Sequence, residues 1–164
     1  MFATGLIRSA EEVLDLCRTR RLVLATAESC TGGLLAALLT EVPGSSKVFE
    51  RGFITYSNDS KMNLLGVSSD LIDHHGAVSE QVALAMAEGA LKHSRASIAI
   101  SITGIAGPGG GTKDKPVGLV FLACTRNGKD SIYSRLELGM RRRKEIRQAA
   151  VVDAIRLLRL QAER

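Results

Sequence analysis

Three adjacent side chains with nucleophilic atoms, Ser29, Cys30 and Thr31, are followed by two glycines, Gly32 and Gly33. The residues before them read as a short buried strand and the Leu/Ala run after them as a helix, so they lie on a strand-to-helix turn. The first amides of a helix lack internal partners and lie at its positive dipole end, where an anion or developing oxyanion is stabilised. The turn therefore predicts a nucleophilic or anion-binding site, with Thr31, Gly32 and Gly33 offering free amides and the glycines allowing close approach of a substrate.

A serine becomes a nucleophile when a base takes its proton, and Lys61 is the favoured base. It lies on a short helix that follows the predicted strand over residues 51–56, which places its amine beside Ser29. The three histidines lie in a polar break or at a helix end and are interpreted as solvated side chains. Tyr56 is a candidate for relaying a proton or holding the substrate. Cys30 competes with Ser29, because a thiol at a helix start is expected to have a lowered pKa; residue order does not choose between them.

A second glycine-rich segment, Thr103–Gly111, follows an apolar, β-rich run over residues 97–102 that is typical of a strand covered on both faces. Its amides are expected to form a second anion-binding nest beside the first. The candidate substrate-binding residues of this loop are Thr103, Gly104, Ala106 and Gly107. Neither a Walker loop nor a Gly-x-Gly-x-x-Gly turn occurs, which argues against nucleoside triphosphate hydrolysis and dinucleotide binding.

The densest positive run, Arg141–Lys144 with Arg147, lies at the start of the last predicted helix. It is suited to clamping a phosphate or following a nucleic-acid backbone, or it is a solvated helix end. The net charge of +5 also favours an anionic ligand. Aromatic residues make up 4% of the chain and Trp is absent, which leaves little for base stacking. The sequence therefore favours a small phosphorylated substrate over nucleic acid.

Strands alternate with helices along the chain and end in a hairpin at Asn127-Gly128. This order predicts one domain over residues 1–164, an α/β fold with three α/β/α layers and a mixed, mostly parallel sheet. The first helix is expected over residues 10–20, after a capping box formed by Ser9 and Glu12. Ligands of such sheets gather at the carboxyl ends of strands, which brings together the loops at residues 28–33, 56–61 and 103–111.

No apolar run reaches the length of a membrane helix, and residues 1–7 lack the character of a secretion signal, so a cytoplasmic protein without membrane contact is expected. The three cysteines are far apart and in no metal-ligand spacing, which predicts neither a disulfide framework nor a zinc site. No metal or cofactor is expected. A symmetric homodimer is expected from the size of the chain alone.

Several motifs, in the right order and over nearly the whole chain, resemble the CinA C-terminal domain family. They are Ala27–Gly33, Pro43–Ser46, Phe49–Asn58 with Lys61, Gly76–Ser79, Thr103–Pro108 and Lys115–Gly118. Members of this type are nicotinamide-nucleotide amidohydrolases, which convert nicotinamide mononucleotide and water to nicotinic acid mononucleotide and ammonia in pyridine nucleotide recycling. Longer CinA proteins carry an additional N-terminal domain, for which this chain is expected to have no room.

The resemblance implies that Ser29 is the nucleophile, that Lys61 is its base, and that Tyr56, Thr31 and the loop Thr103–Pro108 line the substrate pocket. It makes Cys30 a neighbour of the substrate. The family often has Gly-Asp-Arg before its last helix, whereas this chain has Gly139-Met140-Arg141. Arg143 and Arg147 are therefore chosen as the candidates for binding the substrate phosphate.

Two alternatives remain open at this point. One is a non-catalytic binding protein associated with competence or DNA damage, which would bind DNA through residues 141–147 in a salt-dependent manner. The other is an amidase for a different phosphorylated carboxamide. Glu28 has no assigned role: it either orients Lys61 by its charge or caps the end of the strand.

Overall fold

The computed structural model describes residues 2–164, and its centre is a five-stranded sheet in the order β2-β1-β3-β4-β5. The strands are β1 (Leu24–Glu28), β2 (Phe49–Ile54), β3 (Ile98–Gly104), β4 (Leu119–Arg126) and β5 (Lys129–Glu137). Strand β1 pairs in parallel with β2 and β3, while β4 pairs antiparallel with β3 and β5. The mixed sheet is confirmed, and its parallel part carries the turn at Ser29.

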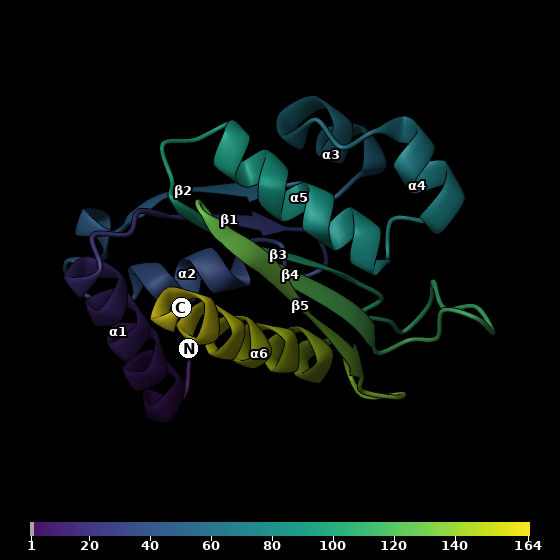
Figure 1. Ribbon diagram of the computed structural model, residues 1–164. Helices are drawn as coiled ribbons and strands as arrows, with labels where there is room; N and C mark the ends of the chain where they lie inside the picture. Colours follow the sequence, from purple (N-terminus) through teal and green to yellow (C-terminus); the bar gives the residue numbers. More distant parts are fainter. Residues whose placement is uncertain (1) are drawn as a thin grey trace.

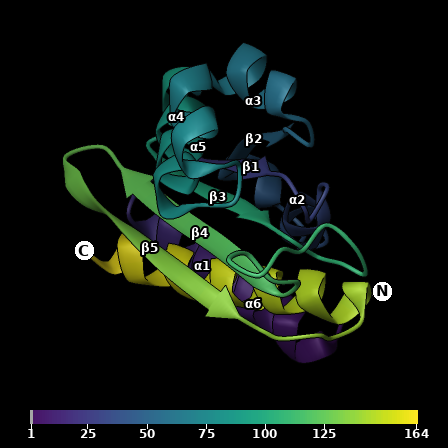
Figure 2. The same cartoon turned by 90° about the vertical axis from the view of Figure 1, so that its right-hand side faces the viewer.

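Helices cover both faces of the sheet, which confirms the three-layer α/β/α prediction (Figure 1). One layer contains α1 (Thr4–Thr19), α2 (Leu34–Thr40) and α6 (Arg143–Glu163). The other contains α3 (Asn58–Leu65), α4 (Ser69–His75) and α5 (Glu80–Lys92), and a short 3-10 helix, η1 (Ser45–Lys47), precedes β2. Figure 2 shows the two helical layers on either side of the sheet, with the loop between β3 and β4 beside the start of α6.

Alternation along β1 divides its side chains between the two layers. All five residues of β1 are buried. Leu24 belongs to the apolar cluster on the side of α1, α2 and α6, whereas Ala25 and Ala27 belong to the cluster beneath α5. Glu28 points the same way as Leu24 in this alternation, toward α2. The last residue of the strand therefore reaches the start of the helix that follows the turn.

Helix α3 packs closely on α5. A Cβ added at Gly89 would lie 2.1 Å from the carbonyl oxygen of Leu65, so glycine is the residue that permits this approach. Ser57 caps α3, and its side chain and that of Ser60 form a reciprocal capping box. Packing and capping together fix the helix that carries Lys61.

The predicted start of the first helix was wrong, because α1 begins at Thr4. The Ser9 hydroxyl donates to the carbonyl oxygen of Gly5 inside the helix and does not cap it. Leu6 and Ile7 pack against the core, so apolar burial extends the helix over residues that the capping-box pattern placed outside it.

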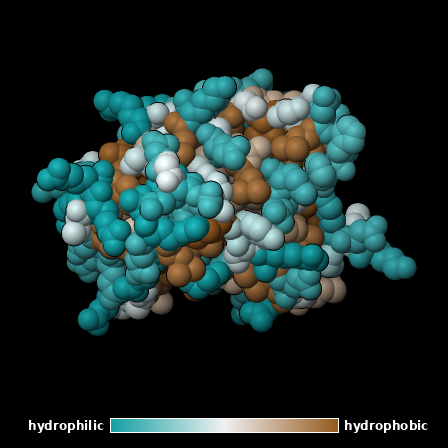
Figure 3. Space-filling view, viewed as in Figure 1, coloured by the Kyte–Doolittle hydropathy of each residue, from teal (hydrophilic) through white to brown (hydrophobic). Residues whose placement is uncertain are grey.

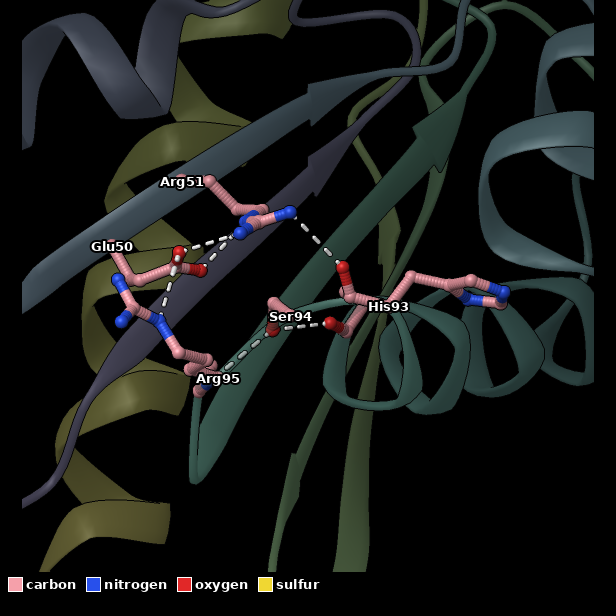
Figure 4. A network of polar contacts seen from close by, with 7 residues as sticks. Glu50, Arg51, His93, Ser94 and Arg95 are labelled. Atoms are coloured by element: carbon pink, nitrogen blue, oxygen red, sulfur yellow. Dashed lines mark hydrogen bonds and ion pairs between the residues drawn. The ribbon is translucent and has the colours of Figure 1, made fainter.

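A polar network lies at the amino ends of the parallel strands, away from the turn at Ser29. Arg51 donates to the Glu50 carboxylate and to the carbonyl oxygen of His93, and Arg95 lies 3.9 Å from the same carboxylate (Figure 4). The hydrogen bonds from Arg51 lower the pKa of Glu50. His93 thus belongs to a link between β2 and the end of α5.

On the face shown in Figure 3, hydrophilic side chains divide the hydrophobic surface into separate patches. Across residues 2–164, no helix has both the length and the apolar character that crossing a membrane requires.

Candidate active site

The amine of Lys61 lies beside the hydroxyl of Ser29. Its Nζ atom is 3.1 Å from Oγ of Ser29 and 2.9 Å from the carbonyl oxygen of Thr55. The Lys61 side chain is 1% exposed and pairs with no carboxylate among residues 2–164. Burial lowers its pKa from the ordinary value, because desolvation penalises the ammonium form. The site therefore brings a serine hydroxyl to an amine whose pKa lies below that of a solvated lysine.

Parallel pairing of β1 and β2 produces this contact. Glu28 lies opposite Ile54 in the register, and the amide of Thr55 donates to the carbonyl oxygen of Glu28. The chain segments after the two strands consequently leave the same edge of the sheet side by side. Ser29 follows directly on β1, and Lys61 reaches it from α3, one helical turn after the cap at Ser57.

Glu28 caps the start of α2. Its carboxylate is 1% exposed and accepts from the amides of Gly33 at 3.1 Å, Leu35 at 3.0 Å and Ala36 at 2.9 Å. Three helix-start amides are thereby satisfied by one carboxylate, whose negative charge lies at the positive end of the helix dipole. These hydrogen bonds match neither of the two roles considered for Glu28, because the carboxylate caps the start of α2 and not the end of the strand.

This cap changes which amides an oxyanion can reach. Gly33 donates to Glu28, and Gly32 donates to the carbonyl oxygen of Ser29, so the expectation of free amides at both glycines was wrong. From Ser29 to Ala37, the amides of Cys30 and Thr31 are those that donate to no oxygen in the part of the chain that the structure describes. Cys30 directly follows the serine, whereas Thr31, the next residue, is fully buried.

The environment of Cys30 contradicts the expected lowering of its pKa. The side chain is 6% exposed, and burial raises the pKa of the thiol to about 11, against smaller opposing effects from its own backbone amide and from Arg143 and Arg147. The nearby Glu28 carboxylate raises it further, and the same carboxylate occupies the helix start that was expected to activate the thiol. Since the thiolate is the reactive form, Cys30 is a poor nucleophile at neutral pH.

A cavity of about 250 Å³ opens over Ser29. It is lined by Ser29, Cys30, Tyr56, Gly104, Ile105, Ala106, Gly107, Gly109, Gly110 and Arg143. The glycine-rich loop thus forms one wall, as expected, and it includes three residues that were not singled out beforehand. Ile105, Gly109 and Gly110 belong to the loop that the sequence had marked only as a whole.

Arg143 crosses the mouth of this cavity from the start of α6. Its Nη1 atom donates to the carbonyl oxygen of Gly107 at 2.8 Å, and its Nη2 atom donates to the Tyr56 hydroxyl at 2.8 Å. Tyr56 is 59% exposed and belongs to the segment between β2 and α3. One guanidinium therefore joins three chain segments around Ser29 and brings positive charge to the cavity.

Other predicted site residues lie near the cavity without lining it. Thr103 donates its hydroxyl to the carbonyl oxygen of Ala77 at 2.7 Å, which ties β3 to the segment before α5. Arg147 lies beneath the turn and donates to the carbonyl oxygen of Thr31 at 2.7 Å. Neither belongs to the cavity wall, and nor do Thr31, Gly32 and Gly33. Arg147 is consequently not placed to meet a phosphate in the cavity, contrary to the expectation.

Comparison with known proteins gives one family. The family model described as the CinA C-terminal domain matches residues 7–162. The chain is 50% identical over 154 residues to a putative competence-damage inducible protein of Clostridioides difficile, covering 94% of this chain and 36% of that protein. A protein of the same description from Caldicellulosiruptor bescii is 49% identical over 147 residues, with 89% and 36% covered. The chain thus spans about a third of the length of these relatives.

Two solved structures have the same fold over the whole chain. The competence/damage inducible protein CihA of Agrobacterium tumefaciens superposes with a TM-score of 0.96 at 44% identity, covering 100% of this chain and 99% of that one. A competence-damaged protein (CinA) superfamily protein of Escherichia coli gives 0.89 at 31% identity, with 100% and 94% covered. The resemblance noted in the sequence is confirmed.

Proposed function

The chain belongs to the CinA C-terminal domain family, and on this basis we propose that it hydrolyses the carboxamide of nicotinamide mononucleotide to nicotinic acid mononucleotide and ammonia. The observation that carries the proposal is the 3.1 Å contact between Nζ of buried Lys61 and Oγ of Ser29. A buried amine that pairs with no carboxylate in the described part of the chain is suited to accept a proton from the hydroxyl that it touches.

In the first half of the proposed reaction, the Lys61 amine takes the proton of Ser29 as Oγ attacks the carboxamide carbon. The amide of Cys30, a residue of the cavity wall that directly follows the serine, is the donor available to the oxygen that becomes negative. Such a donor typically accounts for about 2.7–4 kcal/mol of the barrier. When the intermediate collapses, the C–N bond breaks, the Lys61 ammonium returns the proton to the leaving nitrogen, and ammonia departs from an ester on Ser29.

In the second half, water attacks the ester carbonyl while Lys61 takes one of its protons. Collapse breaks the bond to Oγ, and the Lys61 ammonium reprotonates Ser29. One water is consumed, and one carboxylic acid and one ammonia are formed, so the chain returns to its starting state. Lys61 acts as base and as acid in turn, which a lysine with a lowered pKa does more readily near neutral pH.

The cavity supports an anionic, planar substrate. Four of the residues that line it are glycines of the loop, so a flat ring can approach the backbone closely on that side. Arg143 brings a guanidinium to the mouth, where it would meet the phosphate or ribose of a mononucleotide. Its two present partners are a carbonyl oxygen and a phenol, so the cation has no anionic partner among residues 2–164.

The experiment is ammonia release from nicotinamide mononucleotide by the purified chain, with Ser29→Ala and Lys61→Ala beside it. The proposal expects turnover in the wild type and a loss of about 10²-fold or more in each variant. A panel containing free nicotinamide, nicotinamide riboside and other phosphorylated carboxamides tests the substrate. Turnover of another member of the panel in preference to the mononucleotide would replace the substrate but keep the chemistry; full activity in either variant would overturn the chemistry.

A further inference from the structure

Two oppositely charged side chains hold the turn that carries Ser29 from two sides. The Glu28 carboxylate takes the amides of Gly33, Leu35 and Ala36, at distances of 2.9 to 3.1 Å. Arg147, which comes from α6, donates through Nη2 to the carbonyl oxygen of Thr31 at 2.7 Å. The carboxylate thus fixes amide groups of the turn, and the guanidinium fixes a carbonyl group.

The backbone between these two anchor points needs such fixing. Gly32 has a φ of +56° and Gly33 a φ of +91°, which are left-handed conformations that glycine adopts but does not prefer. A free glycine pair samples many other conformations. Arg147 binds the Thr31 carbonyl before the pair, and Glu28 binds the Gly33 amide within it. Together these two hydrogen bonds select one conformation of the pair. The peptide groups of Cys30 and Thr31, directly before the pair, are then held in one orientation.

The burial of Arg147 beside the turn costs free energy, because one of its donors has no partner. Its Nε atom is buried and finds no partner among residues 2–164, and the guanidinium forms no ion pair there. An unpartnered buried donor costs about 1–3 kcal/mol. The guanidinium thus ties α6 to the turn through one carbonyl oxygen, without an ion pair among residues 2–164.

We propose that Glu28 and Arg147 are positioning residues that hold the Ser29–Thr31 turn, and with it the amide of Cys30, in the geometry that stabilises the oxyanion. They act through the turn and do not touch the substrate. This inference rests on the proposed function for its kinetic test, but the reactivity of Ser29 tests it separately. The two residues lie on elements far apart in the chain, so α6 and β1 together set the geometry of the nucleophile turn.

The variants are Glu28→Gln, Arg147→Met and Arg147→Lys. Glutamine keeps the shape of Glu28 but turns an N–H₂ group toward backbone amides, and methionine removes the donor of Arg147. With nicotinamide mononucleotide, we expect kcat to fall on the order of 10²-fold in Glu28→Gln and Arg147→Met, the loss typical of a displacement of about 1 Å. KM should change little, because neither side chain lines the cavity. Arg147→Lys, which keeps a cationic donor, should restore part of the loss.

Two control variants separate positioning from general stability. Ser79→Ala removes the cap of α5, where Ser79 accepts from the amide of Val82, and costs about 1 kcal/mol without touching the turn. Arg156→Ala removes a different cation of α6, whose ion-pair partner is the Asp153 carboxylate. Both controls should keep the wild-type kcat, with thermal unfolding recorded for every variant. A loss of kcat in Ser79→Ala as large as in Glu28→Gln would overturn the inference, since any cap would then act alike.

Phosphonylation of Ser29 by a fluorophosphonate ester, followed by intact mass, gives a readout that does not require the natural substrate. Its transition state also places an oxyanion beside the nucleophile, so labelling should slow in the same variants and be absent in Ser29→Ala. Labelling of the wild type with slow variants, but no turnover of the mononucleotide, keeps this inference and removes the proposed function. Turnover of the mononucleotide with wild-type kcat in Glu28→Gln and Arg147→Met keeps the proposed function and removes this inference. A wild type that shows neither reaction overturns both.

Discussion

Replacement of Lys61 by methionine separates catalysis from folding, because methionine has a similar length and no charge. In the wild type, the amine pairs with Ser29 Oγ and with the carbonyl oxygen of Thr55. Methionine leaves that carbonyl oxygen without a partner, at a cost of about 1–3 kcal/mol, but relieves the burial of an amine, a gain of similar size. The free energy of unfolding should therefore change by no more than about 1 kcal/mol, or about 2–4 °C in the melting temperature.

The effect on catalysis should be much larger. A positioned general base contributes typically about 10²–10⁴ in rate, equivalent to about 2.7–5.4 kcal/mol at 1.36 kcal/mol per factor of ten. Lys61→Met should lose kcat by this amount at an almost unchanged melting temperature. Lys61→Arg should not recover it, because a guanidinium stays protonated and cannot take the proton of Ser29.

The pH dependence gives a second test with a definite sign. Burial lowers the folded-state pKa of Lys61 below the ordinary value of 10.5, so wild-type kcat/KM should rise with pH and reach its midpoint below 10.5. Between the folded-state pKa and 10.5, the unfolded chain binds more protons than the folded chain. The contribution of Lys61 to stability therefore rises with pH over this window, is complete above 10.5, and is lost as pH falls through the folded-state pKa.

The assays are ammonia release over a pH series and thermal unfolding of the wild type and Lys61→Met over the same series. The difference in stability between the two proteins should follow the sign given above. Lys61→Met with more than a tenth of the wild-type kcat, or with an unchanged pH profile, would refute the assignment of Lys61 as the base.

Three further predictions concern the surroundings of the site. Cys30→Ala should keep turnover, and its loss in this variant would make the thiol the nucleophile. Iodoacetamide should inactivate the wild type only slowly at pH 7, because burial raises the thiol pKa to about 11. Arg143→Ala should lower kcat/KM by a factor equivalent to about 1.5–3 kcal/mol, which is the contribution of a hydrogen bond from a charged group. Tyr56→Phe keeps the cation and should lower kcat/KM less. An equal loss in the two variants would contradict an electrostatic role for the guanidinium. Gly89→Ala should lose about 1–3 kcal/mol of stability and also kcat, because its Cβ would meet an α3 carbonyl oxygen at 2.1 Å and displace the helix that carries the base. Gly5→Ala should instead gain about 0.5–1 kcal/mol, because an added Cβ would meet nothing within 4 Å among residues 2–164 apart from its own stretch of helix backbone. Wild-type stability of Gly89→Ala would contradict the packing argument.

Much of the fold could be predicted from local pattern. Apolar periodicity and turn residues mark the alternation of strands and helices, and the Asn127-Gly128 hairpin joins β4 and β5 as expected. The start of α1 was misplaced because a helix gains more from packing Leu6 and Ile7 than from a favourable cap. Patterns in sequence report local preference, and tertiary burial overrides them where the two differ.

The sequence by itself determined the strand-to-helix turn with its hydroxyl and glycines, and it placed Lys61 one strand away at the same edge of the sheet. Only the tertiary structure decided the state of each group there. Solvation and hydrogen-bond partners fix the chemistry of a side chain, and these come from elements distant in the sequence. The structure thus buried the Cys30 thiol, committed Glu28 to the start of α2, turned Arg147 to the carbonyl of Thr31, and left the amide of Cys30 without an oxygen partner beside Ser29.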